Sequence, residues 1–229
     1  MPELERPSPL NCTVLMGDLI GSDAGNRRAR MAAVFNDAID EANGIYAARL
    51  ISPLTITLGD EFQGLATTLN DGLLIARHLR LRLLNQGVGC RFVVGLVSIE
   101  TPVNRQIAWN MMGSGLSPAR ERLNDKRETS AYRFTLDSFR TPQILMDGIG
   151  DAMTFIEEKW STKQASYVQA NLLGGQSAAD AARTFGISSS AYYKALRTAN
   201  LPLYNRLMSA LEEAASQIDL LWRGPHASD

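Results

Sequence analysis

The sequence predicts an α+β protein in which a half that mixes strands with helices precedes an all-helical half. Apolar runs of strand length alternate with amphipathic helical stretches between residues 10 and 137. From residue 138 onward the apolar spacing is helical, and two short helices separated by a glycine stand within that half. We therefore expect two parts of different class, joined by a linking helix at 138–160.

The composition is that of a globular protein, because 45% of the 229 residues are hydrophobic. The 23 basic and 24 acidic side chains nearly balance, so no net field favours nucleic acid or a membrane surface. Cys12 and Cys90 lie in apolar, strand-like contexts and are expected to be buried, reduced thiols. No apolar run is long enough to span a membrane, and the proline-rich first ten residues do not look like a signal peptide. We expect a cytoplasmic protein that does not bind membranes.

The elements of the first half follow the order strand, helix, hairpin, helix, strand. Asn43 and Gly44 are suited to end the first helix, and Gly87 and Gly89 to turn the chain out of the second. The polar side of the second helix carries His78, which we expect at the surface. This order is that of the split βαβ, ferredoxin-like sheet. The expected elements are a strand at 12–17, helices at 27–44 and 71–85, a hairpin at 54–65, and strands at 91–99 and 131–136.

The hairpin carries two acidic residues at its tip. An alternating apolar run stops at Gly59 and apolar residues resume at Phe62, which is typical of two strands joined by a tight turn. Asp60 and Glu61 stand in that turn, and carboxylates held on a rigid turn suit a hard cation such as Mg²⁺. The alternative is that Asp60 accepts hydrogen bonds from turn amides and Glu61 is solvated.

A third acid, Asp18, follows a buried-type strand that ends at Gly17. Sheet proteins often bind ligands at the carboxyl ends of their central strands. We therefore expect Asp18 and Asp60 to share a metal ion, with Glu61 beside them.

A glycine-rich segment precedes a helix after residue 115. Gly113 and Gly115 flank a serine, and backbone amides of this kind at a helix N-terminus can hold a phosphate. Arg120 and Arg122 lie in the following helix and are expected to reach that charge. The alternative is an ordinary helix cap by Ser117, with a proline at the first helical position.

The second half contains the layout of a helix-turn-helix motif at 177–197. Ser177 and Ser188 are placed to cap two short helices, and Gly186 is placed to turn the chain between them. We expect Ala191 and Leu196 to face inward, which leaves the opposite side of the second helix for the major groove of DNA. The same trihelical unit also mediates protein contacts, so that alternative stays open. The residues expected to contact DNA are Ser189, Ser190, Tyr192, Tyr193, Lys194 and Arg197.

A terminal helix at 203–222 presents an apolar stripe. Such a helix either packs on the rest of the chain or pairs with a second copy of it. A homodimer suits a palindromic DNA site, but the stripe alone does not choose between the two.

Two motifs of the chain resemble the bacterial SatD family: GDLIGS at 17–22 and ITLGDEFQG at 56–64. That family is itself similar to nucleotidyl cyclase and GGDEF catalytic domains, in which a strand-end Asp and a hairpin acid hold two divalent metal ions on a nucleoside triphosphate. The resemblance covers residues 10 to 125, and the helix-turn-helix tail also fits it. It implies a palm-like sheet, a nucleotide ligand, and Mg²⁺ or Mn²⁺ at Asp18 and Asp60. Where the cyclases carry an Asn, this chain has Ser117 or Pro118, which argues against cyclase turnover and leaves nucleotide binding in place.

These expectations combine into a regulatory protein with three parts. A cyclase-like palm at 10–137 binds a metal–nucleotide ligand, a linking helix follows at 138–160, and a helix-turn-helix part at 161–229 binds DNA. Two alternatives remain. The palm is an active enzyme that makes or breaks a nucleotide phosphodiester, or it is a degenerate palm that serves as a dimerisation scaffold.

Overall fold

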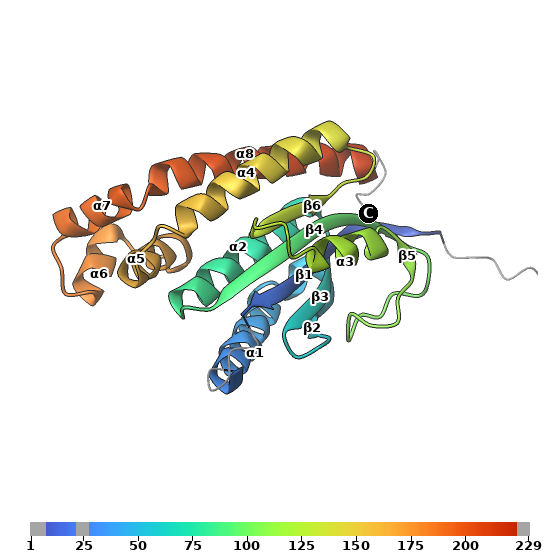
Figure 1. Ribbon diagram of the computed structural model, residues 1–229, viewed down its shortest axis with the longest axis horizontal. Coiled ribbons are helices and arrows are strands. Elements are labelled where there is room, and N and C mark those ends of the chain that lie inside the picture. The colour runs from blue at the N-terminus through green and yellow to red at the C-terminus, as the bar shows by residue number, and fades with distance from the viewer. Residues whose placement is uncertain (1–7, 22–27, 224–229) are drawn as a thin grey trace, which may run out of the picture.

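A computed structural model describes residues 8–21 and 28–223 of the chain. Expectations for the chain ends at 1–7 and 224–229, and for the segment at 22–27, lie outside the described residues. The mixed α+β class is confirmed: strands and helices alternate up to residue 135, and helices follow (Figure 1). The elements are β1 (Leu10–Ile20), α1 (Arg28–Ile45), the 3-10 helix η2 (Ala47–Arg49), β2 (Leu50–Ile56), β3 (Glu61–Ala66), α2 (Leu69–Asn85), β4 (Gly89–Ile99), β5 (Gly113–Ser114), α3 (Leu116–Asn124), β6 (Tyr132–Thr135), α4 (Arg140–Glu157), α5 (Thr162–Leu173), α6 (Ala178–Thr184), α7 (Ser189–Thr198) and α8 (Leu201–Arg223).

The sheet has the strand order expected of a ferredoxin-like arrangement. Strands β2, β3, β1 and β4 lie side by side in that order, and each neighbouring pair is antiparallel. At one end of β4 the short strand β5 adds an antiparallel pairing, and at the other end β6 pairs with β4 in parallel. The extra strands widen the sheet on the side of β4, next to the loop at 100–112 and helix α3.

Strand β1 extends further than the sequence suggested. We expected it to end at Gly17, but it continues to Ile20, which pairs with Gly89 of β4. The backbone N–H of Leu19 also donates to the carbonyl oxygen of Asp60, at 2.9 Å. Leu19 and Ile20 prolong the apolar run, and this pairing accommodates them as strand residues. Asp18 therefore lies within a central strand, with a neighbour on each side.

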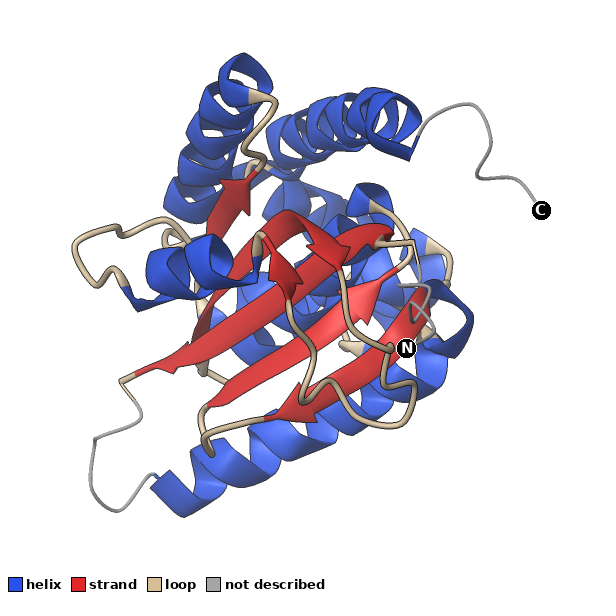
Figure 2. Cartoon of the chain, turned by 90° about the vertical axis from the view of Figure 1, so that its right-hand side faces the viewer, coloured by secondary structure: helices blue, strands red, loops and turns tan. Residues whose placement is uncertain are grey.

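The two faces of the sheet differ in what covers them. Helices α1 and α2 pack on one face, over a core that includes Leu15, Phe35, Phe62 and Phe92. Helix α3 packs on the opposite face over a smaller apolar cluster. Among the described residues, the loop at 100–112 also packs against that cluster, through Val103 and Met111. Figure 2 looks onto this second face, which is crossed by one short helix and loops, with long helices behind the sheet. We call this second face the open face.

The helical tail packs directly against the sheet half of the chain. Helices α5 and α8 contact α2, and α4 lies beside α8 (Figure 1). The carboxylate of Asp219 in α8 accepts hydrogen bonds from the first backbone amides of α2, at 2.7 Å from Leu69 and 3.2 Å from Asn70. This carboxylate satisfies amides that a helix start leaves unpaired. One hydrophobic cluster runs through both parts, so the expected division at 137 and 160 follows element boundaries and stays a prediction as a division into domains.

A buried ion pair also joins the two parts. Arg80 of α2 donates through Nε to Glu157 of α4, at 2.7 Å, and both side chains are buried. The hydroxyls of Tyr132 and Tyr204 donate to the other carboxylate oxygen of Glu157, at 2.7 and 3.0 Å. A buried charge needs such partners because desolvation disfavours it strongly. The pair thus ties α2, β6, α4 and α8 together.

His78 was expected at the surface and is buried instead, with 5% of its area exposed. The hydroxyl of Tyr46 lies 3.1 Å from its Nδ1, and the Glu41 carboxylate lies 3.6 Å from its Nε2. The polar side of α2 is therefore an internal surface, because neighbouring helices cover it. Among the described residues, no helix is both long and apolar enough to cross a membrane.

Candidate functional site

Three charged side chains stand in a row across the open face. Asp18 of β1 is paired in register with Glu61 of β3 on one side and with Arg91 of β4 on the other. Paired residues of neighbouring strands point to the same face. Arg91 donates two hydrogen bonds to Oδ2 of Asp18, one from Nε at 2.9 Å, and only 8% of Asp18 is exposed. The central carboxylate is thus neutralised by an arginine of its own sheet.

Glu61 is the second carboxylate of this row, and it is less well neutralised. Burial raises the pKa of its carboxyl above the ordinary value, and the negative charges of Asp18 and Asp60 raise it further. Arg120 and Arg91 act in the opposite direction, but the net shift is upward. Burial and two neighbouring negative charges thus disfavour the ionised form of Glu61, and a bound cation would favour it.

Asp60 lies next to Glu61 in sequence but borders a different hollow. It lines a cavity of about 370 Å³ together with Arg28 and Leu19, at the α1 side of the hairpin turn. Gly59 precedes it with φ +79°, a left-handed conformation that favours glycine in this tight turn. The expected hairpin is confirmed. It brings Glu61 directly beside Asp18, and Asp60 close enough for its charge to raise the pKa of Glu61.

The predicted metal ligands are therefore neighbours but do not form a closed cage. Within the part of the chain that the structure describes, no three acidic, histidine or cysteine side chains are arranged to hold an ion. The donor chemistry suits a hard cation, since carboxylate oxygens are the ligands that Mg²⁺ prefers. An ion that used Asp18 would have to compete with Arg91.

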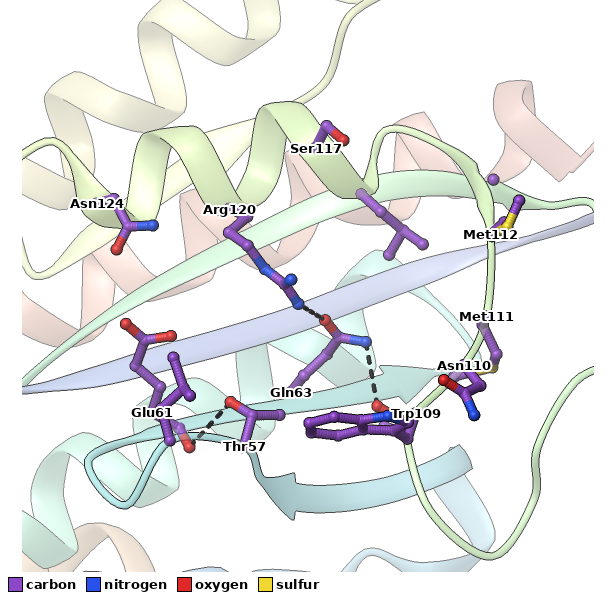
Figure 3. Close-up of a pocket in the computed structure, with 14 residues that line it drawn as sticks. Thr57, Glu61, Gln63, Trp109, Asn110, Met111, Met112, Ser117, Arg120 and Asn124 are labelled. Atoms are coloured by element: carbon purple, nitrogen blue, oxygen red, sulfur yellow. Dashed lines mark hydrogen bonds between the residues drawn. The ribbon is translucent and has the colours of Figure 1, made fainter.

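The main pocket of the open face has a volume of about 820 Å³ (Figure 3). Its walls come from segments far apart in sequence: the hairpin with Thr57 and Glu61, strand β3 with Gln63, the loop at 108–112, and helix α3 with Arg120. Side chains from these segments meet across the pocket because α3 crosses over β1 and β4.

One hydrogen-bonded chain spans this pocket. Arg120 donates from an Nη atom to Oε1 of Gln63, at 2.9 Å, and Nε2 of Gln63 donates to the carbonyl oxygen of Ala108, at 3.3 Å. The backbone N–H of Ala108 donates to Oγ1 of Thr55 in β2, at 2.9 Å. Figure 3 shows Gln63 between Arg120 and Trp109. Helix α3, the sheet and the loop are thereby fixed to one another around the cavity.

The glycines of the predicted phosphate segment have a packing role in the structure. Gly113 lines the pocket. It belongs to the short strand β5 and pairs there with Ile99 of β4. A Cβ on Gly113 would lie 2.1 Å from the carbonyl oxygen of Ser98, and one on Gly115 would lie 2.4 Å from that of Leu96. Both positions thus need glycine because the segment approaches β4 closely.

The helix cap considered as an alternative is not formed. Helix α3 begins at Leu116, and its N-cap is Gly115, with φ +88° and no side-chain cap. Ser117 falls inside the first turn and lines the pocket instead. The N-terminal turn of α3 thus borders the cavity, and phosphate binding there stays a prediction.

The two arginines of α3 have different surroundings. Arg120 reaches into the pocket, whereas Arg122 binds Glu128 at 2.6 Å and Asp147 at 3.0 Å, and also donates to the carbonyl of Phe134. These contacts hold α3 to the segment that leads into β6 and to α4. The structure therefore places Arg120 in the same pocket as Glu61 and keeps Arg122 in a separate ion-pair cluster.

In the tail, Ser177 and Ser188 cap α6 and α7 as expected, and Gly186 turns the chain between them with φ +65°. The expected orientation of α7 was wrong in one respect. Tyr192 was expected to face outward and is fully buried, whereas Ala191 was expected to face inward and is exposed.

The reason for the buried Tyr192 is an aromatic cluster. The centroid of its ring lies 5.6 Å from that of Tyr167 of α5 and 6.3 Å from that of Phe185. Its hydroxyl donates to the carbonyl oxygen of Tyr167 at 2.9 Å. The inward stripe of α7 consists of Tyr192, Leu196 and, just after the helix, Ala199. The other five predicted DNA-contacting residues are exposed: Ser189, Ser190, Tyr193, Lys194 and Arg197.

Sequence reasoning missed three side chains of the open face. Arg91 was treated as an ordinary strand residue, although a charged residue inside an apolar run signals a partner on the neighbouring strand. Gln63 follows the acidic turn by two residues, on the same side of β3 as Glu61. Trp109 belongs to a loop without periodicity, and a large aromatic residue in such a loop is the available signal.

Known proteins with similarity to the chain include several solved structures and one protein family. Solved structures similar to the chain include a bacterial light-regulated adenylyl cyclase, with 12% identity and a TM-score of 0.42 over 56% of this chain and 77% of that one. The guanylyl cyclase Cya2 is 14% identical, with a TM-score of 0.32 over 49% of this chain and 68% of that one. The catalytic core of a rhodopsin-guanylyl cyclase with converted specificity, in complex with ATPαS, is 15% identical. Its TM-score is 0.36 over 53% of this chain and 76% of that one. No curated protein matches significantly. The SatD family model matches residues 12–214, nearly the whole length, and the chain belongs to the SatD family.

Proposed function

We propose that this protein is a regulator whose open face binds a nucleotide together with Mg²⁺ or Mn²⁺, and whose helical tail binds DNA. The observation that carries the proposal is the convergence on one pocket of Glu61, Gly113 and Arg120, each expected from sequence to serve metal or phosphate binding. A volume of about 820 Å³ falls within the usual range for small-molecule sites.

The charges around the pocket suit a phosphorylated ligand with a cation. Arg120 offers a guanidinium to a phosphate, and the first turn of α3 offers backbone amides nearby. Glu61 would hold the divalent ion, together with Asp60 or Asp18. The ion would neutralise phosphate charge, and it would offset the burial and the neighbouring negative charges that raise the pKa of Glu61.

The tail supplies the second half of the proposal. Helices α6 and α7, with the turn at Gly186, form a helix-turn-helix in which α7 is the recognition helix. Tyr193, Lys194 and Arg197 are exposed on α7 and supply an aromatic ring and two positive charges. Tyr192 has no place in the DNA contact because it is buried. A homodimer would place two α7 helices on a palindromic site.

Contacts through α2 support a link between the ligand and the tail. This helix packs on the sheet, its first amides are bound by Asp219 of α8, and its Arg80 is paired with Glu157 of α4. A shift of the sheet on ligand binding would therefore move α2 and, through these contacts, change the positions of α4 and α8. Occupancy of the pocket would then alter DNA affinity.

Thermal unfolding with Mn²⁺ and each nucleoside triphosphate tests the pocket, in wild type and in Asp60→Asn and Glu61→Gln variants. A ligand at a hundredfold its dissociation constant adds about 2.7 kcal/mol, which raises the Tm of a chain of this size by several degrees. We expect a shift in wild type that Glu61→Gln reduces most. DNA affinity measured with and without that nucleotide tests the coupling. Equal shifts in all three proteins would contradict the metal assignment, and equal DNA affinities would contradict the regulatory link.

A further inference from the structure

Trp109 is the large aromatic side chain of the main pocket. It lines the cavity from the loop at 100–112, and 46% of its area is exposed. We propose that a base of the ligand stacks on this indole, so that the pocket takes a nucleoside phosphate and not a free polyphosphate. This inference rests on the proposed function, which it extends from phosphate and metal to the base.

The backbone that carries the indole is anchored to the sheet. Ala108, directly before it, is 1% exposed, and both its backbone groups are hydrogen-bonded to sheet side chains. Its N–H donates to Thr55 at 2.9 Å, and its carbonyl oxygen accepts from Gln63 at 3.3 Å. An aromatic ring carried by an anchored backbone loses little freedom when a ligand binds, and pre-organisation of this kind favours affinity.

The Gln63 side chain, which anchors the loop, also positions the guanidinium of Arg120. Gln63 accepts from Arg120 at 2.9 Å through its other amide atom. In Figure 3 the guanidinium of Arg120 and the carboxylate of Glu61 lie on one side of Gln63, and Trp109 lies on the other. One amide thus links the guanidinium of Arg120 to the backbone that carries the aromatic ring.

The walls of the pocket divide along the same line. Met111 lines the pocket from the same loop as Trp109, whereas Glu61 and Arg120 supply charged groups from the hairpin and from α3. A ligand with a flat apolar ring at one end and an anionic group at the other matches this division. Base–aromatic stacking in proteins changes affinity by about 5- to 150-fold per base, and it tolerates any base because every base has a π-face.

The experiment is a calorimetric titration of the full chain, in Mn²⁺, with ATP, GTP, CTP and UTP and with inorganic tripolyphosphate. The proteins are wild type, Trp109→Ala, Trp109→Phe and, as a matched control, Ile107→Ala, which removes an exposed apolar side chain of the same loop outside the pocket. Since Trp109 is half exposed, its replacement leaves the core intact.

We expect wild type to bind at least one nucleotide about tenfold or more tightly than tripolyphosphate. Trp109→Ala should lower that nucleotide's affinity to the level of tripolyphosphate and leave tripolyphosphate binding unchanged. Trp109→Phe should retain most of the affinity because it keeps a ring, and Ile107→Ala should bind as wild type does.

Two results would overturn the stacking role while leaving the proposed function in place. One is a nucleotide affinity that Trp109→Ala does not change. The other is a change of sedimentation mass in Trp109→Ala without loss of nucleotide affinity, which would assign the indole to a contact between copies of the chain. If wild type binds none of the five compounds, both the stacking role and the nucleotide proposal fall.

Discussion

Arg91 donates from Nε to the carboxylate of Asp18 at 2.9 Å, and both side chains are mostly buried on the open face of the sheet. A guanidinium therefore occupies one side of the carboxylate that the sequence marks as a metal ligand. An ion that binds Asp18 through Oδ2 has to displace this arginine, so the pair influences how readily the site accepts a metal.

Replacing Arg91 by Gln is expected to destabilise the protein and to increase its response to metal. Removing one partner of a buried ion pair leaves the other charge uncompensated and costs about 3 kcal/mol. Mn²⁺ should restore part of that loss, because Asp18 and Glu61 would then share a cation. Chemical denaturation of wild type and Arg91→Gln, each with and without Mn²⁺, measures both effects.

The control for that experiment is Arg82→Gln, which breaks a half-exposed pair with Glu41. Exposed pairs contribute about 1 kcal/mol or less, so this variant should lose little stability and gain nothing from Mn²⁺. If Mn²⁺ stabilises Arg91→Gln no more than wild type, Asp18 is not a ligand of the ion.

Arg120 and Arg122 lie two residues apart on α3 and should give opposite results. Arg120→Gln removes the guanidinium from the pocket and should weaken nucleotide binding about tenfold or more, with little change in Tm, because a hydrogen bond to a charged group contributes about 1.5–3 kcal/mol. Arg122→Gln breaks contacts to Glu128 and Asp147 and should lower Tm while leaving affinity unchanged. The reverse pattern would place the phosphate at the other arginine.

The neighbouring tyrosines of α7 separate folding from DNA binding. Tyr192→Ala empties a buried aromatic site and should cost about 3–5 kcal/mol. Tyr193 is 59% exposed, so Tyr193→Ala should change stability by less than about 0.5 kcal/mol and should weaken binding to mixed-sequence duplex DNA. Anisotropy titrations at several salt concentrations, with Lys194→Ala and Arg197→Ala as charge variants, should show the salt slope fall by about 1 for each lost phosphate contact. A slope that neither variant changes would exclude α7 from the DNA contact.

His78 should make stability depend on pH. Burial lowers its pKa below the ordinary value, and Arg82 and Arg77 lower it further, against the raising effect of Glu41. Because the unfolded state then binds protons more readily, the free energy of unfolding should fall as the pH drops below about 6.5. Urea denaturation between neutral pH and about pH 5 should show a shallower decline in His78→Gln. An unchanged decline would assign the pH dependence to other groups.

Much of the fold follows from local signals in the sequence. The hairpin turn at Gly59 and the caps at Ser177 and Ser188 were identified correctly, because each depends on a few neighbouring residues. The order of strands and helices then leaves few ways to build the sheet. The end of β1 was misjudged because Asp18 looked like a boundary, although the apolar residues Leu19 and Ile20 follow it.

Errors and omissions arose where several segments meet. Helical spacing alone did not choose between Ala191 and Tyr192 as the inward residue of α7, and the choice depends on Tyr167 and Phe185 from other helices. His78 is buried because neighbouring helices cover the polar side of α2. The pairing of Arg91 with Asp18 required the strand register.

Calorimetric titration is the direct test of whether the pocket beside Glu61 binds a nucleotide. Each nucleoside triphosphate is titrated in Mn²⁺ into wild type and into Glu61→Gln. We expect one site per chain for at least one nucleotide in wild type, with affinity about tenfold or more weaker in Glu61→Gln, because an ionised ligand of the cation is lost. Absence of binding by wild type, or equal affinity in the two proteins, would contradict this expectation.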